Sequence, residues 1–348
     1  MLSLLLFPFA VLYDLVTRLR NLFYDWGWKR SRSFDCAVIS VGNLNVGGSG
    51  KSPMIEYLVN LLIDKYSVAI LSRGFGRTTH GFLLAEKHDD ATTIGDEPFQ
   101  FYRKFGSRVS VVVCENRVSG IAQLLKKKPA VNVILLDDAF QHRAVRPLFS
   151  ILLTDFSKPF FNDHVLPMGR LREQRGSSVR ADVIVVTKCD HLPDESGNEF
   201  KTRLSAHAGH KPVFFSGVGY KLPKAMEGEE PVSKNIVLVT GIANSRPMVD
   251  YVSSHFNLIH HFNFKDHHPY SIEDIKVIQT KANSSTHILT TEKDMVKLIA
   301  PEWRNVINKK LWFYLPIESY FLKNGSEFDK MVEKKIEDFR VVDPKKLR

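Results

Sequence analysis

Residues 41–53 read Val41-Gly42-Asn43-Leu44-Asn45-Val46-Gly47-Gly48-Ser49-Gly50-Lys51-Ser52-Pro53. Glycines in such a loop turn successive backbone N–H groups toward one anion, a lysine reaches the terminal phosphates, and a hydroxyl ligates Mg²⁺. The first hypothesis is therefore chemistry on ATP or GTP. The predicted nucleotide-binding residues are Asn45, Val46, Gly47, Gly48, Ser49, Gly50, Lys51 and Ser52.

The loop departs from the formal phosphate-loop pattern at Asn45, where that pattern has glycine. Asn is the non-glycine residue that best tolerates a positive φ angle, so we expect Asn45 to take the place of that glycine. The flanking residues favour the same interpretation. An apolar run at 36–41 reads as a buried strand, and residues 54–64 carry apolar side chains at helical spacing. Strand, glycine loop and helix follow one another in the order that a phosphate site requires.

The size and composition are those of a soluble globular protein with two domains. The chain has 348 residues, of which 44% are apolar and 25% are charged. Its three cysteines are far apart, which predicts neither a disulfide framework nor a zinc site and fits a reducing cytoplasm. The net charge of +10 suits nucleic acid, an anionic membrane or phosphorylated substrates equally well, so charge alone does not choose a partner.

Residues 1–35 favour a membrane surface. The apolar run at 2–13 is shorter than the roughly twenty residues that cross a bilayer, and charged residues follow it. A helix through this region has one apolar face, formed by Leu12, Leu15, Val16, Leu19 and Phe23. Such a helix is typical of an interfacial membrane anchor. A helix packed on its own domain and an uncleaved signal-like start are the alternatives.

The remaining pattern predicts an α/β protein. Apolar strand-like runs at 67–71, 109–114, 131–136, 149–154 and 183–187 alternate with helical segments, which favours a doubly wound, mostly parallel sheet. A second set of strands and helices follows a Gly- and Pro-rich stretch. We therefore expect a membrane-associating helix at 1–35, a P-loop lobe at 36–215, a connector at 216–234 and a smaller α/β lobe at 235–348.

Two acidic pairs are candidates for the chemistry. Asp137 and Asp138 end an apolar strand, where an acid commonly holds Mg²⁺ directly or through water. Asp96 and Glu97 lie in a turn before a helical segment. Asp96 is a candidate base for a hydroxyl nucleophile, and Glu97 a candidate support for the metal or for that base. Helix capping by Asp96 is an equally good explanation.

Three further stretches have less specific signals. Asp266-His267-His268 places imidazoles beside a carboxylate, and one histidine would tune the basicity of Asp96 if the lobes face each other. Arg-rich stretches at 72–77 and 169–173 are candidate phosphate clamps, with solvent-facing loops as the alternative. Lys293 either points into the cleft or belongs to a capped helix start. The segment 187–190 approximates a guanine-reading strand end, but Thr187 replaces the usual Asn.

Taken in order, these stretches resemble the tetraacyldisaccharide 4′-kinase family of lipid A biosynthesis over roughly residues 1–320. The resemblance rests on the phosphate loop and on the segments 72–77, 95–98, 136–143, 166–173, 266–270 and 291–294. It implies a kinase at the cytoplasmic face of the bacterial inner membrane. Such an enzyme uses ATP and Mg²⁺ to phosphorylate the 4′-hydroxyl of an acylated glucosamine disaccharide 1-phosphate, and it has no nucleic-acid partner. The oligomeric state is not predicted.

The resemblance also implies a role for each matched residue. Lys51 becomes the phosphate lysine, Ser52 a magnesium ligand, and Asp137 or Asp138 the strand-end metal acid. Asp96 becomes the general base, with Glu97 close by. His267 becomes its partner, preferred over His268 because it directly follows Asp266 in the matched segment. The further residues expected to line the phosphate or sugar region are Arg73, Arg77, His142, Arg172 and Glu173, with Arg172 among the catalytic candidates.

Two rival functions remain open from the sequence. One is a P-loop GTPase or metal-insertion ATPase that hydrolyses nucleotide without a lipid acceptor. The other is a basic, membrane-bound nucleotide sensor without enzymatic activity. Dependence of turnover on the acceptor separates both rivals from the kinase.

Overall fold

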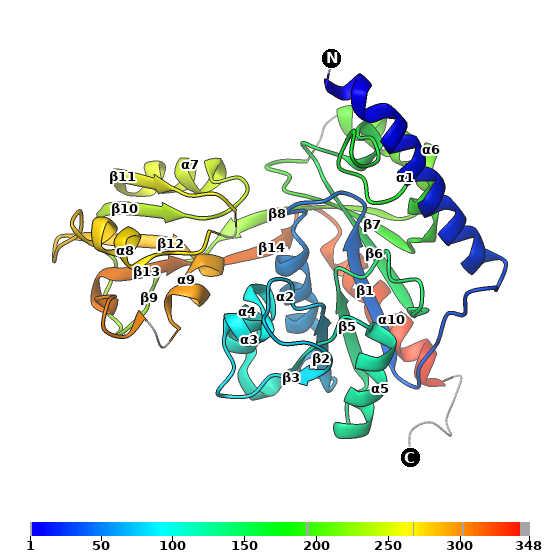
Figure 1. Cartoon of the computed structure of the whole chain (residues 1–348), viewed down its shortest axis with the longest axis horizontal. Coiled ribbons are helices and arrows are strands. Elements are labelled where there is room, and N and C mark those ends of the chain that lie inside the picture. The colour runs from blue at the N-terminus through cyan, green and yellow to red at the C-terminus, as the bar shows by residue number, and fades with distance from the viewer. Residues whose placement is uncertain (1, 193–194, 267, 301–302, 342–348) are drawn as a thin grey trace.

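The computed structural model describes residues 2–192, 195–266, 268–300 and 303–341. The chain forms a large and a small lobe, each built on its own sheet (Figure 1). The large sheet has the order β14-β8-β7-β6-β1-β5-β2-β4-β3. Its strands are β1 (Ala37–Asn43), β2 (Val68–Ser72), β3 (Leu83–Leu84), β4 (Ser110–Val113), β5 (Val133–Asp137), β6 (Phe149–Asp155), β7 (Val183–Thr187), β8 (Val213–Tyr220) and β14 (Ile317–Phe321).

The large sheet is doubly wound, as the alternating pattern predicts. The strands from β8 to β4 pair in parallel, and only the outer strands β3 and β14 run antiparallel to their neighbours. Successive side chains enter opposite layers: Ile39 packs with α2 (Lys51–Leu62), α4 (Asp96–Phe105) and α10 (Gly325–Val341), whereas Val38 packs with α5 (Arg117–Lys127). Both faces are therefore covered, which explains why these strands read as continuous apolar runs.

Shorter elements complete the large lobe. Helix α6 (Glu195–Ala208) packs over β6 and β7 on the same face as α5. The remaining elements are α3 (Ala91–Ile94) and the 3₁₀ turns η1 (Gly106–Arg108), η2 (Phe160–Asn162) and η3 (Arg175–Arg180). Together these elements leave the carboxyl ends of β1, β5 and β7 at one edge of the sheet, where ligands bind in open α/β folds.

The small lobe is a five-stranded sheet with the order β11-β10-β12-β13-β9. Its strands are β9 (Lys224–Ala225), β10 (Asn235–Thr240), β11 (Asn257–Asn263), β12 (Thr286–Thr291) and β13 (Trp312–Leu315). The other elements are α7 (Arg246–His255), α8 (Ile272–Gln279), α9 (Glu292–Leu298) and η5 (Lys309–Leu311). Apolar clusters on both faces of this sheet make it a second core, as expected for a smaller α/β lobe.

The extent of the lobes differs from the expected boundaries. Strand β8 continues through Tyr220, so the large sheet reaches into the expected connector. After β13 the chain returns to the large sheet as β14, which pairs with β8. Helix α10 then buries Phe328, Val332 and Ile336 against the large lobe. The C-terminal segment expected in the small lobe thus belongs to the core of the large one, and the chain crosses between the lobes twice.

Helix α1 (Leu2–Asp25) lies along the outside of the large lobe (Figure 1). Its polar side holds it there: Asn21 is buried, and Tyr13 donates to the carbonyl of Arg172 at 3.1 Å. The apolar side faces outward, with Leu12 60% and Val16 57% exposed. This orientation is the reverse of that expected for a helix packed on its own core. Within the described residues, no helix combines the length and apolar character needed to cross a membrane.

Candidate active site

The phosphate loop joins β1 to α2 at the carboxyl edge of the large sheet. Gly47 has a φ angle of 105° and Gly50 one of 79°, a region that glycine enters at little cost. Gly50 is the N-cap of α2, which begins at Lys51. The loop therefore ends at a helix N-terminus, where backbone N–H groups and the helix dipole favour an anion.

Asn45 does not replace the missing glycine in the expected way. Its φ angle is not positive; the non-glycine residues with positive φ in the described chain are Asp138, Lys188 and Asn324. Instead, Asn45 pairs with Leu171 in an antiparallel bridge, and its amide donates to Asp163 Oδ2 at 2.9 Å. The segment around Leu171 thus fixes the first half of the loop from outside, so that an extended Asn is accommodated.

Lys51 and Ser52 occupy the first turn of α2, as the strand-loop-helix pattern predicts. Lys51 Nζ donates to Asn43 Oδ1 at 3.2 Å and lies 3.8 Å from Asp138 Oδ1. The lysine side chain therefore reaches back along the loop toward the end of β5. In this position its charge lies between the loop and the two strand-end aspartates.

Asp137 is the last residue of β5 and is buried. Ser72 Oγ donates to its Oδ2 at 2.9 Å, whereas Oδ1 is buried without a hydrogen-bond partner. Burial, and then repulsion from the neighbouring Asp138, raises the pKa of Asp137 to about 6. An unpartnered buried carboxylate oxygen at this point is what a bound cation would stabilise.

Asp138 has a different environment. Arg172 donates to both carboxylate oxygens of Asp138, from Nη1 to Oδ2 at 3.0 Å and from Nη2 to Oδ1 at 2.7 Å. Its Nη2 also donates to Asn43 Oδ1 at 2.6 Å. Burial opposes ionisation of Asp138, but Lys51 and Arg172 outweigh it and hold the pKa of this carboxyl below its usual value. Lys51, Asp138 and Arg172 therefore form one charged group beside the phosphate loop.

The residues at the end of β5 fit Mg²⁺. This ion prefers oxygen ligands and binds through one or two carboxylates together with water and substrate phosphates. Asp137 supplies an unpartnered oxygen, and Asp138 and Ser52 are the other candidate ligands. In the described part of the chain there is no cluster of three or more His, Cys, Asp or Glu side chains that could hold a metal by themselves. A site completed by the nucleotide agrees with both findings.

The two aspartates predict opposite effects on stability. The pKa of Asp137 is raised to about 6. Folding therefore becomes less favourable as the pH rises from the ordinary pKa of an aspartate toward about 6. Asp137→Asn should therefore raise Tm at pH 8 by about 1–4 °C, and by less at pH 5. The pKa of Asp138 is lowered, so its carboxylate stabilises the fold at pH values above the ordinary pKa of an aspartate. Asp138→Asn should therefore lower Tm at pH 8. Scanning fluorimetry measures both, and a lower Tm for Asp137→Asn at pH 8 would contradict the prediction.

Asp96 and Glu97 begin helix α4, on the side of the large lobe that meets the small lobe. Gly95, with φ 94°, is the N-cap of this helix, and Asp90 caps the preceding helix α3. Asp96 is therefore the first helical residue and not the N-cap, which was its alternative explanation. Its Oδ2 lies 3.5 Å from Lys297 Nζ in α9.

Asp266 and His268 of the small lobe lie close to the same place. Asp266 Oδ1 lies 3.0 Å from Lys293 Nζ, which in turn is 3.7 Å from Glu97 Oε1. His267 lies outside the described residues, so its pairing with Asp96 stays a prediction. His268 Nε2 is 3.1 Å from Asp274 Oδ2, which orients this imidazole toward α8. Lys293 thus points into the space between the lobes rather than serving only as part of a helix start.

Several other predicted residues have partners within the large lobe. Arg77 is buried and pairs with Glu115 at 2.5 Å, and Glu173 pairs with Arg180 at 2.6 Å. Burial, and then the nearby arginines, lowers the pKa of His142 to about 4, so this imidazole is neutral at physiological pH. Arg77 and Glu173 therefore support the loops around the site. Arg73 contributes charge, since its field lowers the pKa of the His142 imidazole.

The strand end at Thr187 lies against the phosphate loop. Thr187 Oγ1 donates to the carbonyl of Ser49 at 2.9 Å, and Lys188 Nζ donates to the carbonyl of Gly48 and pairs with Asp155 at 2.8 Å. These contacts fix the glycine-rich half of the loop. The segment at 187–190, which resembles a guanine-reading strand end, thus supports the phosphate loop through hydrogen bonds to its carbonyl groups.

Two residues at the site are not predicted from the sequence. Arg117 is 1% exposed and donates from Nη2 to the carbonyl of Asp137 at 3.2 Å, which fixes the end of β5 from behind. The second is Lys297, whose Nζ lies 3.5 Å from Asp96 Oδ2. Arg117 begins an ordinary amphipathic helix, and no local pattern marks it. Lys297 does follow Lys293 by one helical turn, a spacing that places both lysines on one face.

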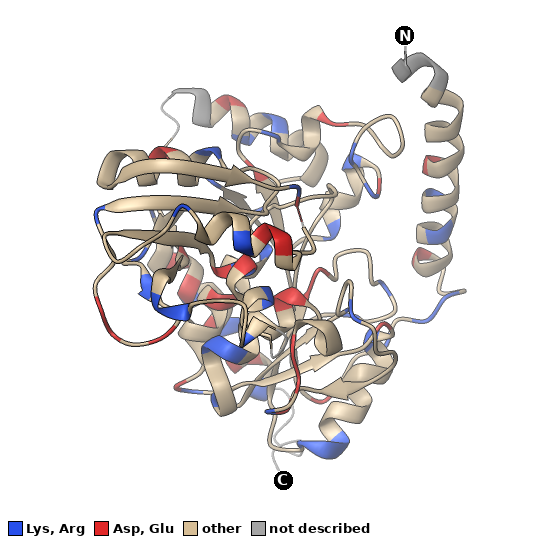
Figure 2. Cartoon of the chain, turned by 60° about the vertical axis from the view of Figure 1, so that its left-hand side comes forward, with Lys and Arg blue, Asp and Glu red and all other residues tan. Residues whose placement is uncertain are grey.

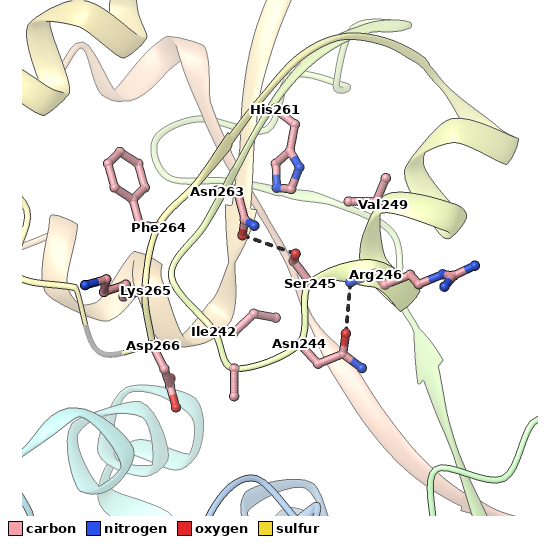
Figure 3. Close-up of a pocket in the computed structure, with 11 residues that line it drawn as sticks. Ile242, Asn244, Ser245, Arg246, Val249, His261, Asn263, Phe264, Lys265 and Asp266 are labelled. Carbon is pink, nitrogen blue, oxygen red and sulfur yellow. Dashed lines mark hydrogen bonds between the residues drawn. The ribbon is translucent and has the colours of Figure 1, made fainter. Parts of the chain in front are cut away.

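A pocket of about 680 Å³ opens in the small lobe at the carboxyl ends of β10 and β11 (Figure 3). Its walls come from the turn before α7 and from the segment that ends at Asp266. The lining is polar at Asn244, Ser245 and Asn263, and the side chains of Ser245 and Asn263 are hydrogen-bonded at 3.2 Å. Asp266 lies at the end of the pocket and connects it to the space between the lobes.

The fold and the site define a P-loop nucleotide-binding protein of the doubly wound α/β class, with a second lobe beside its phosphate loop. A family model described as Tetraacyldisaccharide-1-P 4'-kinase matches residues 2–337. The chain therefore belongs to this family. The predicted family resemblance is confirmed.

Individual relatives agree with the family match. A tetraacyldisaccharide 4′-kinase of Flavobacterium johnsoniae is 43% identical over 331 residues, covering 93% of this chain and 94% of the relative. One from Cytophaga hutchinsonii is 40% identical over 343 residues, covering 97% of each chain. The crystal structure of LpxK from Aquifex aeolicus in complex with ATP has a TM-score of 0.78 and 28% identity, covering 97% of this chain and 100% of that chain.

Proposed function

We propose that this protein transfers the γ-phosphoryl group of ATP to the 4′-hydroxyl of a tetraacylated glucosamine disaccharide 1-phosphate. The product is the bis-phosphorylated lipid A precursor, lipid IVA. Family membership supports the reaction, and the similar Aquifex aeolicus protein was crystallised with ATP. The observation that carries the proposal in this chain is the charged group of Lys51, Asp138 and Arg172 at the end of a phosphate loop. The GTPase and metal-insertion alternative has no comparable support.

The chain's own residues supply positioning and charge neutralisation. The γ-phosphate already carries most of the charge, so Lys51, the loop N–H groups and Arg172 would stabilise it as it moves to the acceptor. Asp137, Asp138 and Ser52 would hold Mg²⁺, which would supply positive charge to offset the negative charge of the phosphates. Arg172 pairs with Asp138 in the present structure, so nucleotide binding would require this arginine to share its donors with phosphate.

Asp96 is the proposed general base. A carboxylate within hydrogen-bond reach of the 4′-hydroxyl would orient it and accept its proton as the phosphoryl group arrives. The position of Asp96 at the lobe boundary supports this role, because the acceptor must enter from outside the phosphate loop. His267 is proposed as its partner on the small lobe, and Glu97 as a neighbouring acid.

An acceptor assay tests the reaction against its rivals. Purified protein is incubated with γ-labelled ATP or GTP, with and without tetraacyldisaccharide 1-phosphate. We expect label in the lipid product only when ATP and the acceptor are both present. Acceptor-independent hydrolysis or a preference for GTP would favour a nucleotide hydrolase. Nucleotide binding without any turnover would favour the sensor.

We further propose that α1 places the protein on the cytoplasmic face of the bacterial inner membrane. Its outward apolar side supports this proposal, as do Trp26 and Trp28, which are 59% and 73% exposed beyond the helix. Its inner side is tied to loops near the site: Arg143 pairs with Asp25 at 2.6 Å, and Arg20 donates to the carbonyl of Gln141. The helix would thus hold the site close to an acylated acceptor that stays in the bilayer.

Charge placed on the outer side of α1 should release the protein from membranes. Leu15→Glu together with Leu19→Glu is expected to lower binding to vesicles of anionic phospholipid about tenfold or more, because apolar area is lost and charge enters the interface. Cosedimentation measures the bound fraction. Leu222→Glu is the control, since Leu222 is 83% exposed but belongs to the segment that joins β8 to β9 rather than to α1. Equal loss in both variants would contradict the role of α1.

A further inference from the structure

Helix α9 of the small lobe meets helix α4 of the large lobe through charged side chains. Two of its lysines, Lys293 and Lys297, are one turn apart and therefore lie on the same side of the helix. Lys293 approaches Glu97 at 3.7 Å, and Lys297 approaches Asp96 at 3.5 Å. Figure 2 shows acidic and basic segments of the ribbon side by side between the lobes.

The same two lysines also contact Asp266 and His268 of their own lobe. Lys293 Nζ lies 3.0 Å from Asp266 Oδ1, and Lys297 Nζ donates to the carbonyl of His268 at 3.4 Å. Each lysine thus connects one acid at the start of α4 with one residue flanking position 267. The two lysines thereby place positive charge among the carboxylates of Asp96, Glu97 and Asp266 where the lobes meet.

Both lysines are largely enclosed. The side chain of Lys297 is 14% exposed and that of Asp96 is 18% exposed. An ion pair at this degree of burial is screened by salt less than a pair on the surface. Asp294, which is fully buried, lies 3.9 Å from Lys297 and accepts a hydrogen bond from the backbone of Gly241 at 2.8 Å. The ammonium of Lys297 therefore lies beside a carboxylate that is fixed in the interior of the small lobe.

We propose that Lys297, assisted by Lys293, is a positioning residue that holds the carboxylate of Asp96 close to the backbone of His268 in the small lobe. In this role Lys297 does not touch nucleotide or acceptor and acts only through Asp96. The inference rests on the proposed function, because it gives Asp96 the role of the base.

The test compares kcat and the KM for ATP of the full-length protein with those of Lys297→Met. We expect kcat to fall about tenfold to a hundredfold, with KM for ATP unchanged within about twofold, because the phosphate loop is intact. Lys297→Arg should recover kcat to within about threefold of the wild type, since it keeps the positive charge. If Lys297→Met does not fold, Lys297→Gln serves in its place, and Tm is measured for every variant.

A double-mutant cycle with Asp96→Asn separates positioning from general structure. If Lys297 acts through Asp96, Lys297→Met should lower kcat less than about twofold further in the Asp96→Asn background. A further tenfold loss in that background would overturn the inference. Full activity of Asp96→Asn alone would instead overturn the role of Asp96 as base, so the two failures are distinguishable.

Lys104 is the matched control. Lys104 lies in the last turn of α4, at the opposite end of this helix from Asp96, and also links α4 to α9. Its Nζ lies 2.6 Å from Glu56 and 3.2 Å from Glu292, the first residue of α9. Lys104→Met leaves buried Glu56 without its cation, so we expect a lower Tm but a kcat within about threefold of the wild type. Equal losses of kcat in Lys104→Met and Lys297→Met would show that only lobe docking matters, and would overturn the inference.

Discussion

Lys51→Met is expected to lower kcat by at least about 10²–10³-fold, the largest effect of any single change in the phosphate loop. Lys51 is the first residue of α2, and its ammonium lies between Asn43 and Asp138. Its loss would leave the terminal phosphates of ATP without their nearest cation on the helix side. The binding of ATP should weaken as well, because the same charge contacts the nucleotide before and during transfer.

Steady-state kinetics and calorimetric titration with ATP measure these effects. Lys128→Met is the control. This exposed lysine caps the end of α5 just before β5 and so lies toward the sheet edge opposite the phosphate loop. The fold of Lys51→Met should persist, because its ion pair with Asp138 at 3.8 Å is long and Arg172 also binds that carboxylate. Turnover close to that of the wild type would remove Lys51 from the mechanism.

Asp96→Asn is expected to lower kcat by about 10²–10⁴-fold, within the range for loss of a general base. Asparagine keeps the shape of the side chain and the first turn of α4, but it cannot accept a proton from the acceptor hydroxyl. The affinity for ATP should change little, because Asp96 lies at the lobe boundary and the phosphate loop is formed by other residues.

Single-turnover measurements with saturating ATP and acceptor isolate this step. Asp90→Asn is a suitable comparison, since Asp90 caps the neighbouring helix α3 through its side chain and has no proposed chemical role. We expect Asp90→Asn to retain most of the activity. If Asp96→Asn turns over at nearly the wild-type rate, another group must accept the proton.

The architecture of the large lobe was predictable because its signals are local. Strands such as Val183–Thr187 are continuous apolar runs, and burial on both faces of a parallel sheet produces that pattern. The path of the chain after β13 was not predictable in this way. Strand β14 and helix α10 have ordinary apolar spacing, and nothing in that spacing tells which of two sheets they will join.

The candidate site shows the same division. The loop at 45–52 and the strand end at Asp137 carry patterns that follow directly from phosphate and metal chemistry. Asn45 illustrates the limit. Its tolerance of positive φ suggests one conformation, but pairing with Leu171, which is distant in the sequence, imposes another. Arg117 and Lys297 act through tertiary contacts with Asp137 and Asp96, so their importance appears only once the elements are assembled.

In the proposed reaction the phosphoryl group reaches the 4′-hydroxyl of the acylated disaccharide. The most direct test is to incubate the purified protein with ATP, Mg²⁺ and tetraacyldisaccharide 1-phosphate, and to locate the new phosphate by phosphorus and proton NMR of the isolated lipid. We predict one new phosphomonoester, coupled to the proton at the 4′ position, in an amount equal to the ADP formed. Inorganic phosphate in place of this product, or a phosphate at another position, would contradict the account.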